Sequence, residues 1–276
     1  MRCFRQGCLL KQTARPKRRN VSRPDLPRDR FGIRGNMSVQ QLFQAGRLDD
    51  AIQALNAEVR DNPTDAKRRT FLFELLCFSG DFVRAEKQLD ILGSEGRNAE
   101  MGALLYHAAL HAERTRHDLF SKKQYPIPKN TAGLGQLSVS VNGKPFHDLS
   151  DGDPRIGSNL EVFAAGSYMW IPFALLTSIE IAPPKRLRDL LWLPAKVRTS
   201  DKYEDRELGE VLLPVLTPFA GQHKDPAVRL GRATVWEETD DGESIPVGQK
   251  ILLADDEEWP ILELRNIQIA IAQTAS

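Results

Sequence analysis

The stretch QAGRLDDAIQALNAE at residues 44–58 decides the fold of the N-terminal part, because its pattern returns as FSGDFVRAEKQLDIL at residues 78–92. In both copies a glycine turns the chain between two helices, an alanine lets their backbones approach, and large apolar side chains fill the seam. The matching positions are Gly46 and Gly80, Leu48 and Phe82, Ala51 and Ala85, and Leu55 and Leu89. The sequence therefore predicts paired helices in this region.

The two copies are offset by 34 residues, which is the period of the tetratricopeptide repeat. The pattern yields about two units, the first with a short leading helix, and a further helix near residues 99–119. A free-standing solenoid needs at least about three repeats to bury a continuous core. We therefore expect these helices to pack on the C-terminal half of the chain.

The first helix begins with a complete set of start signals in NMSVQQLF, residues 36–43. Ser38 and Gln41 have the spacing of a capping box, in which each side chain accepts a hydrogen bond from the backbone N–H of the other residue. Met37 directly precedes this cap. We expect translation to start at Met37, with residues 1–36 as an upstream extension.

Residues 1–36 form a basic arm, with eleven Lys or Arg against two Asp and a net charge of +9. The rest of the chain carries −8, so the overall charge of +1 hides an asymmetry. Segments with high net charge and few apolar residues do not bury a core, and we expect the arm to be disordered. Its charge makes a nucleic-acid binder one alternative function. We do not expect a nucleic-acid partner, because that role requires the arm to be translated.

The apolar stretch EVFAAGSYMWIPFALLTSIE at residues 161–180 has 18 uncharged positions between its two glutamates, which raises the question of a membrane span. A spanning helix needs about 20 predominantly apolar residues. Gly166 and Ser167 instead predict a turn, and Pro172 predicts the end of a strand or an edge strand. The three cysteines have no disulfide or metal spacing, which is typical of a reducing compartment. We therefore predict a buried hairpin in a cytoplasmic protein without membrane contact.

From residue 126 onward the sequence changes to short apolar runs separated by polar turns. LSVSVNGKPF at residues 137–146 contains Asn-Gly, a dipeptide typical of tight hairpins. Further strand candidates are residues 161–165, 167–173, 195–200, 210–216, 233–239, 249–254 and 260–270. Many short strands with few helices predict an antiparallel sheet or a barrel-like domain. We predict an α+β protein, with a tetratricopeptide-like helical domain over residues 37–125 packed on an antiparallel β-rich domain over residues 126–276.

The sequence contains no phosphate-binding loop, dinucleotide fingerprint, nucleophile elbow or paired-cysteine zinc motif. His107 and His111 share a helix face, but the residue after His107 is Ala and not the general-base Glu of zinc peptidases. Asp148, Asp151 and Asp153 lack the glycine and the distal glutamate of an EF-hand loop. A metal-dependent hydrolase built on these histidines and aspartates is an alternative that we disfavour. We expect no enzymatic activity, no metal and no cofactor.

Seven blocks of the sequence, taken in their order and spacing, resemble the family ImpE, also called TagJ, an accessory protein of bacterial type VI secretion. The blocks are LFQAGRLDDAIQAL, FLFELLCFSGDFVRAEKQLDIL, DGDPRIGSNLEVF, GSYMWIPF, KRLRDLLWLPA, LGRATVWEE and VGQKILL, and the resemblance covers about residues 37–270. The resemblance implies a cytoplasmic adaptor without catalytic residues. It further implies that the partner is the N-terminal helix of the small contractile-sheath subunit, with a link to the Clp-type ATPase that disassembles the sheath.

All four tryptophans lie in the C-terminal half of the chain, together with several arginines. Trp, Tyr and Arg dominate the energetics of protein interfaces, and recognition of a helix places its apolar face in a cleft. The alternative is that the tryptophans fill the core of the sheet, which we favour for Trp170. The predicted partner interface consists of Arg155, Tyr168, Arg186, Arg188, Asp189 and Trp192.

Overall fold

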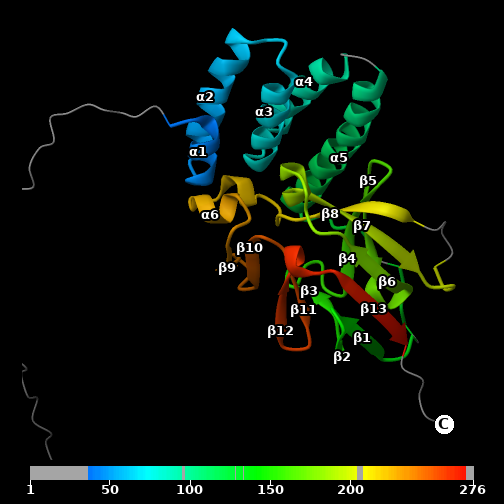
Figure 1. The fold of residues 1–276 in the computed structure, drawn as a ribbon. Coiled ribbons are helices and arrows are strands. Elements are labelled where there is room, and N and C mark those ends of the chain that lie inside the picture. Colours follow the sequence, from blue (N-terminus) through cyan, green and yellow to red (C-terminus); the bar gives the residue numbers. More distant parts are fainter. Residues whose placement is uncertain (1–36, 95–96, 128, 133, 204–207, 272–276) are drawn as a thin grey trace, which may run out of the picture. The chain divides into compact units, whose positions relative to one another are not determined.

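The first helix begins at the predicted capping box. The Ser38 side chain accepts a hydrogen bond from the backbone N–H of Gln41, and the Gln41 side chain accepts one from Ser38 at 2.8 Å. The computed structural model describes residues 37–276 apart from 95–96, 128, 133, 204–207 and 272–276 (Figure 1). The basic arm lies outside the described residues, so its disorder and its upstream origin stay predictions.

Five helices follow one another in the N-terminal region. They are α1 (Val39–Gln44), α2 (Leu48–Asp61), α3 (Ala66–Phe78), α4 (Phe82–Gly93) and α5 (Arg97–Ser121). Gly46 and Gly80 have φ of +79° and +74° at the turns before α2 and α4, the left-handed region that favours glycine. The prediction of paired helices at a 34-residue spacing is therefore confirmed, and α5 extends the predicted last helix at both ends.

The strands that follow are antiparallel throughout the described residues. The largest sheet has the order β2 (Lys144–Phe146), β1 (Leu137–Val141), β13 (Asn266–Ile271), β6 (Leu176–Ile181), β7 (Trp192–Thr199), β8 (Gly209–Pro214), β4 (Asn159–Ala164) and β5 (Ser167–Pro172). A second sheet has the order β12 (Glu257–Pro260), β11 (Ile251–Ala254) and β3 (Ser150–Asp151), and a hairpin pairs β9 (Thr234–Glu238) with β10 (Ser244–Gly248). The α+β prediction is confirmed.

Two details of the predicted strands need correction. The turn between β4 and β5 is formed by Ala165 and Gly166, whose φ angles are +48° and +82°, and Ser167 already belongs to β5. A two-residue turn with positive φ at both central positions matches the twist of the strands it joins. The candidate strand at 260–270 is interrupted by a 3-10 turn, η4 (Ile261–Glu263), and pairing resumes at Asn266. Pro172 ends β5 at the edge of the sheet, as predicted.

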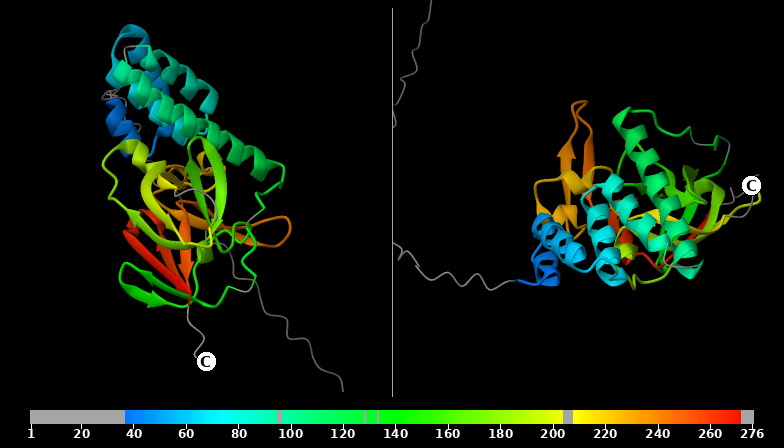
Figure 2. Two further views of the ribbon diagram at one scale, coloured as in Figure 1. Left: turned by 90° about the vertical axis from the view of Figure 1, so that its right-hand side faces the viewer. Right: turned by 90° about the horizontal axis from the view of Figure 1, so that it is seen from above.

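The helices lie over one end of the strands (Figures 1 and 2) and share a hydrophobic core with them. This core packs Phe163, Trp192 and Leu230 of the β-rich part among the apolar side chains of α2, α3 and α5. A separate core fills the space between the strands themselves. The prediction that an incomplete repeat array packs on the C-terminal half is therefore confirmed.

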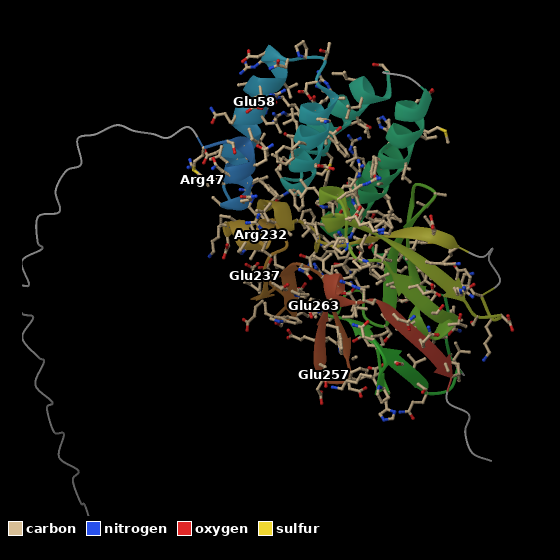
Figure 3. All side chains as sticks on the ribbon, in the orientation of Figure 1. Arg47, Glu58, Arg232, Glu237, Glu257 and Glu263 are labelled. Carbon is tan, nitrogen blue, oxygen red and sulfur yellow. The ribbon has the colours of Figure 1, made fainter. Side chains whose placement is uncertain are left out.

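The segment between β8 and β9 also contacts the first helical hairpin, through an ion pair and hydrogen bonds. Arg229, on α6 (Pro226–Arg229), forms an ion pair with Asp49 at 2.7 Å, and Arg232 donates hydrogen bonds to the carbonyls of Phe43 and Gln44. Figure 3 shows Arg232 beneath the end of α1. Carbonyls at a helix end have no partner within the helix, so the arginine satisfies groups that would otherwise need water.

In the described part of the chain, none of the helices has the length and apolar character to cross a bilayer.

Candidate docking site

A cavity of about 500 Å³ lies between α5 and the β-rich part. One wall comes from α5, a second from the turn between β4 and β5, and a third from the segment after β6, while β7 and β8 form the floor. The turn approaches the helix closely, since a Cβ on Gly166 would lie 3.4 Å from the Cβ of Ala108. This distance is an ordinary van der Waals contact, so the φ of +82° at Gly166, and not a lack of space, is what favours glycine at this end of the cavity.

An exposed apolar stripe on α5 runs into the cavity. Met101, Leu104 and Leu105 are 70%, 69% and 52% exposed, and their spacing places them on one face of the helix. Leu105 also lines the cavity. Large apolar side chains that are exposed together mark interaction sites more often than single ones do. We refer to these three residues as the α5 stripe.

Asp189, on the 3-10 turn η2 (Leu187–Leu190), fixes the backbone at the polar rim of the cavity. Its carboxylate accepts hydrogen bonds from the backbone N–H groups of Lys185 and Arg186, at 2.8 and 2.9 Å. The guanidinium of Arg188 lies 4.7 Å from the ring centre of Tyr106, another lining residue. Burial raises the pKa of Tyr106, although the nearby arginines oppose this effect. The tyrosine is therefore a neutral hydrogen-bonding group at neutral pH.

Trp192 lies in the floor of the cavity and is only 2% exposed. Its ring stacks on Tyr106 with 6.2 Å between centroids, and its indole N–H donates to Glu113 at 3.0 Å. A partner would therefore contact Trp192 from above, through the cavity.

Beneath the cavity, a buried network of charges joins α5 to the strands. Arg116 is 1% exposed and donates two hydrogen bonds of 2.9 Å to Glu161 of β4, and one of 3.0 Å to Glu113. Lys250 pairs with Glu161 and with Asp151, the latter at 2.5 Å. Each buried charge thus faces an opposite charge, which is the condition under which charges are tolerated in a protein interior.

The acid groups of this network titrate differently. Burial tends to raise the pKa of Glu161, but Arg116 and Lys250 outweigh burial and hold it well below its usual range. Burial also raises the pKa of Asp151, to about 6. Lys250 offsets the effect of burial only in part, and the charge of Glu161 raises the pKa further. The network is therefore fully ionised only above the pKa of Asp151.

The structure divides the six predicted interface residues into two groups. Arg186, Asp189 and Trp192 line the cavity, and Arg188 lies behind it against Tyr106. Arg155 and Tyr168 do not line it.

The second group makes contacts inside the fold. Arg155 pairs with Asp153 at 2.5 Å, and its guanidinium lies 4.9 Å from the ring centre of Phe120. The Tyr168 hydroxyl donates to Glu161 and accepts a hydrogen bond from the Trp170 indole. Burial and Glu161 raise the pKa of Tyr168 well above its usual range. Trp170 is buried, as predicted.

Sequence reasoning missed the α5 stripe and the charged network. The stripe was visible in principle, because Met101, Leu104 and Leu105 have the spacing of one helix face. The network had no local signal, since Arg116 and Glu161 are 45 residues apart and each reads as an ordinary surface residue.

Three residues of the alternative metal site are committed to other contacts. His107 lies 3.3 Å from Asp90, Asp151 pairs with Lys250, and Asp153 pairs with Arg155. Within the described ranges, no group of three or more His, Cys, Asp or Glu side chains is placed to hold a metal ion. The geometry gives the hydrolase alternative no support.

Comparison with known proteins shows which family and which relatives this chain resembles. Residues 143–268 match the family described as ImpE protein, and residues 42–107 match the tetratricopeptide repeat. The chain is 32% identical over 262 residues to the type VI secretion system accessory component TagJ of Pseudomonas aeruginosa strain PAO1, covering 84% of this chain and 90% of that protein. Protein VPA1032 of Vibrio parahaemolyticus, a crystal structure, has the same fold with a TM-score of 0.74 and 23% identity, covering 85% of this chain and 98% of that one.

Proposed function

Because this chain belongs to the ImpE family, with TagJ as a curated relative, we propose that it is a non-enzymatic adaptor of a type VI secretion system. Its partner in this proposal is the N-terminal helix of the small contractile-sheath subunit. The adaptor acts in the cytoplasm and is linked to the Clp-type ATPase that disassembles the sheath. The partner, the compartment and the link to the ATPase are inferred from the family resemblance.

The observation that supports the proposal is the continuity between the α5 stripe and the cavity. An amphipathic helix binds by laying residues at i, i+3, i+4 and i+7 into an apolar groove. Here the α5 stripe offers an exposed apolar ridge, and the cavity beside Leu105 offers a recess over Tyr106 and Trp192. The charged lining is balanced, with Lys185 and Arg186 against Asp189 and Glu210, so the apolar ridge and the recess provide the recognition surface.

Titration calorimetry tests this proposal. The full chain is titrated with a peptide that spans the N-terminal helix of the small sheath subunit from the same genome. We expect a dissociation constant of about 1 μM or below, with a negative heat-capacity change because apolar surface becomes buried.

Two matched variants locate the site. Leu104→Asp places a charge on the α5 stripe, and we expect it to weaken binding at least about tenfold. Val83→Asp makes the same change at an exposed apolar residue of α4 outside the cavity lining, and it should leave binding unchanged. Equal affinities of the two folded variants would place the partner elsewhere. No binding by the unaltered protein would contradict the adaptor function itself.

A further inference from the structure

A second hollow, of about 750 Å³, opens on the helical region on the other side of η2. It is lined by α1, α2 and α3 and by Leu187, whereas Arg186 and Asp189 line the cavity described above. Figure 3 shows Glu58 of α2, one of its lining residues. We refer to this hollow as the α2–α3 groove.

Glu74 of α3 lines the α2–α3 groove and is only 8% exposed. Among the described residues, no donor makes a hydrogen bond or an ion pair with its carboxylate. Burial raises the pKa of Glu74 to about 7, with Asp189 adding to the effect and Arg188 and Arg186 opposing it. Neither carboxylate oxygen is among the fully enclosed polar atoms without a partner, so the carboxylate is reached through the groove and is open to a ligand that supplies a donor.

The cations near the groove do not supply that donor. Arg68 is held by Glu58 at 3.0 Å and by Asp65. Arg188 lies over the ring of Tyr106, and its buried Nε has no hydrogen-bond acceptor. The groove lining contains three acidic residues (Glu58, Asp65, Glu74) and two basic ones (Lys67, Arg68), and the neighbouring Arg186, Arg188 and Asp189 bring the charged groups around Glu74 to four acidic and four basic. The acceptor for a cation is therefore the Glu74 carboxylate itself and not a net charge of the groove.

The remaining lining combines three apolar residues with the uncharged polar residues Gln40 and Thr70. Leu55, Phe71 and Leu187 surround the approach to Glu74. Lysine and arginine side chains combine an apolar stem with a cationic head, and the planar guanidinium of arginine binds a carboxylate through two donors. The volume and open form of the groove also leave room for the backbone that carries such a side chain.

We propose that the α2–α3 groove binds a lysine or arginine side chain presented by a protein partner, with the Glu74 carboxylate as its acceptor. The stem of that side chain lies against Phe71 and Leu187, and its head group reaches the floor. This site lies apart from the cavity assigned to the sheath helix and does not depend on that assignment.

The proposal implies a defined pH dependence. A cationic head group binds the ionised form of Glu74, so affinity rises as the pH increases through about 7, and binding releases a proton. The other charged or titratable groups that face Glu74 from the packed elements and the groove are Arg186, Arg188 and Asp189 of the η2 segment, Glu58 of α2, and Asp65, Lys67, Arg68 and Cys77 of α3. Among these, Asp189 accepts hydrogen bonds from the backbone N–H groups of Lys185 and Arg186.

The test compares two peptides on the full chain by NMR titration. The first probe is acetyl-Leu-Arg-Leu-amide, and the second is the same peptide with citrulline, a neutral isostere, in place of arginine. We expect the arginine peptide to bind at least about tenfold more tightly at pH of about 8, and this preference to shrink severalfold at pH of about 6. The preference should be lost in Glu74→Gln and kept in Glu86→Gln, a change on α4 outside the groove.

Either of two results overturns the proposal. One is equal affinity of the two peptides for the unaltered chain, which remains decisive even if a variant fails to fold. The other is an arginine preference that survives in a folded Glu74→Gln variant, because the cation would then bind elsewhere. Binding of the sheath-subunit peptide is measured in the same variants. If a variant no longer binds this peptide but still prefers the arginine probe, the adaptor function is contradicted and the α2–α3 groove proposal is not.

Discussion

The two halves of α5 place their side chains in opposite ways. In the N-terminal half, Met101 and Leu104 are mostly exposed, whereas in the C-terminal half the charged Glu113 and Arg116 are buried. Apolar residues usually lie inside and charged residues outside, so each half departs from the general rule. The C-terminal half is fixed to the strands through paired charges, and the N-terminal half presents a surface that nothing in the described chain covers. The buried charges and the proposed recognition surface therefore lie on different halves of one helix.

The largest expected effect comes from removing the central cation of the buried network. In Arg116→Met, Glu161 loses two hydrogen bonds and Glu113 loses one, and both carboxylates stay buried. Breaking a buried ion pair by removing one partner costs about 3–5 kcal/mol. Urea denaturation should show a loss of this size in the free energy of unfolding.

The matched control for this change is Arg114→Met, two residues earlier on the same helix. Arg114 forms an ion pair with Glu86 at 2.5 Å, but both side chains are more than a third exposed. Exposed pairs contribute about 0–1 kcal/mol. If the two variants lost similar stability, the C-terminal half of α5 would not be held by its buried charges.

A smaller effect is expected at the contact between the network and the cavity floor. Trp192→Phe removes the indole N–H that Glu113 accepts and leaves one carboxylate oxygen without that donor. Loss of a hydrogen bond to a buried charged group costs about 1–3 kcal/mol, measured as the change in unfolding free energy. Trp236→Phe is the control, because Trp236 is largely exposed on β9 and the change should have little effect.

The sequence predicted the elements whose signals are local. The glycines at a 34-residue spacing, the Ser38 capping box and the Asn142-Gly143 turn each specify a conformation within a few residues, and the structure contains all three. Of the six residues of the predicted interface, Arg186, Asp189 and Trp192, which are close together in the chain, line the same cavity, and their role in binding stays a prediction.

The pairing of distant charges was not predicted. Arg116 meets Glu161 and Lys250 lies near Asp151 only because the tertiary fold brings α5, β4 and the start of β11 together. Arg155 and Tyr168 were assigned to a surface because Arg and Tyr are common at interfaces. The contacts that they make inside the fold, with Asp153 and Glu161, depend on backbone geometry that composition does not contain.

Removing the charge of Glu74, which has no hydrogen-bond partner, should raise the free energy of unfolding, whereas removing the charge of Arg116 should lower it. The folded-state pKa of Glu74 is raised from 4.5 to about 7, so the folded chain binds the proton more tightly than the unfolded chain. The resulting stability is fully present below about pH 4.5 and is lost as the pH rises through about 7. Glu74→Gln, which keeps the side chain neutral, should therefore raise the free energy of unfolding by up to about 3 kcal/mol at pH of about 8. Urea denaturation at pH of about 4, below the unfolded-state pKa, should show almost no difference, and a destabilised variant at both pH values would mean that the carboxylate has a partner.

The smallest effect is expected on the exposed half of α5. Leu104→Ser removes an apolar side chain that is 69% exposed, and a surface change of this kind alters stability by about 0.5 kcal/mol or less. Leu110→Ala, six residues further along the same helix, removes a side chain that is fully buried and should cost about 2–5 kcal/mol. Thermal or urea denaturation of both variants measures the difference directly. A large loss for Leu104→Ser would mean that Leu104 packs within the chain itself, and the N-terminal half of α5 would then have no free surface to offer a partner.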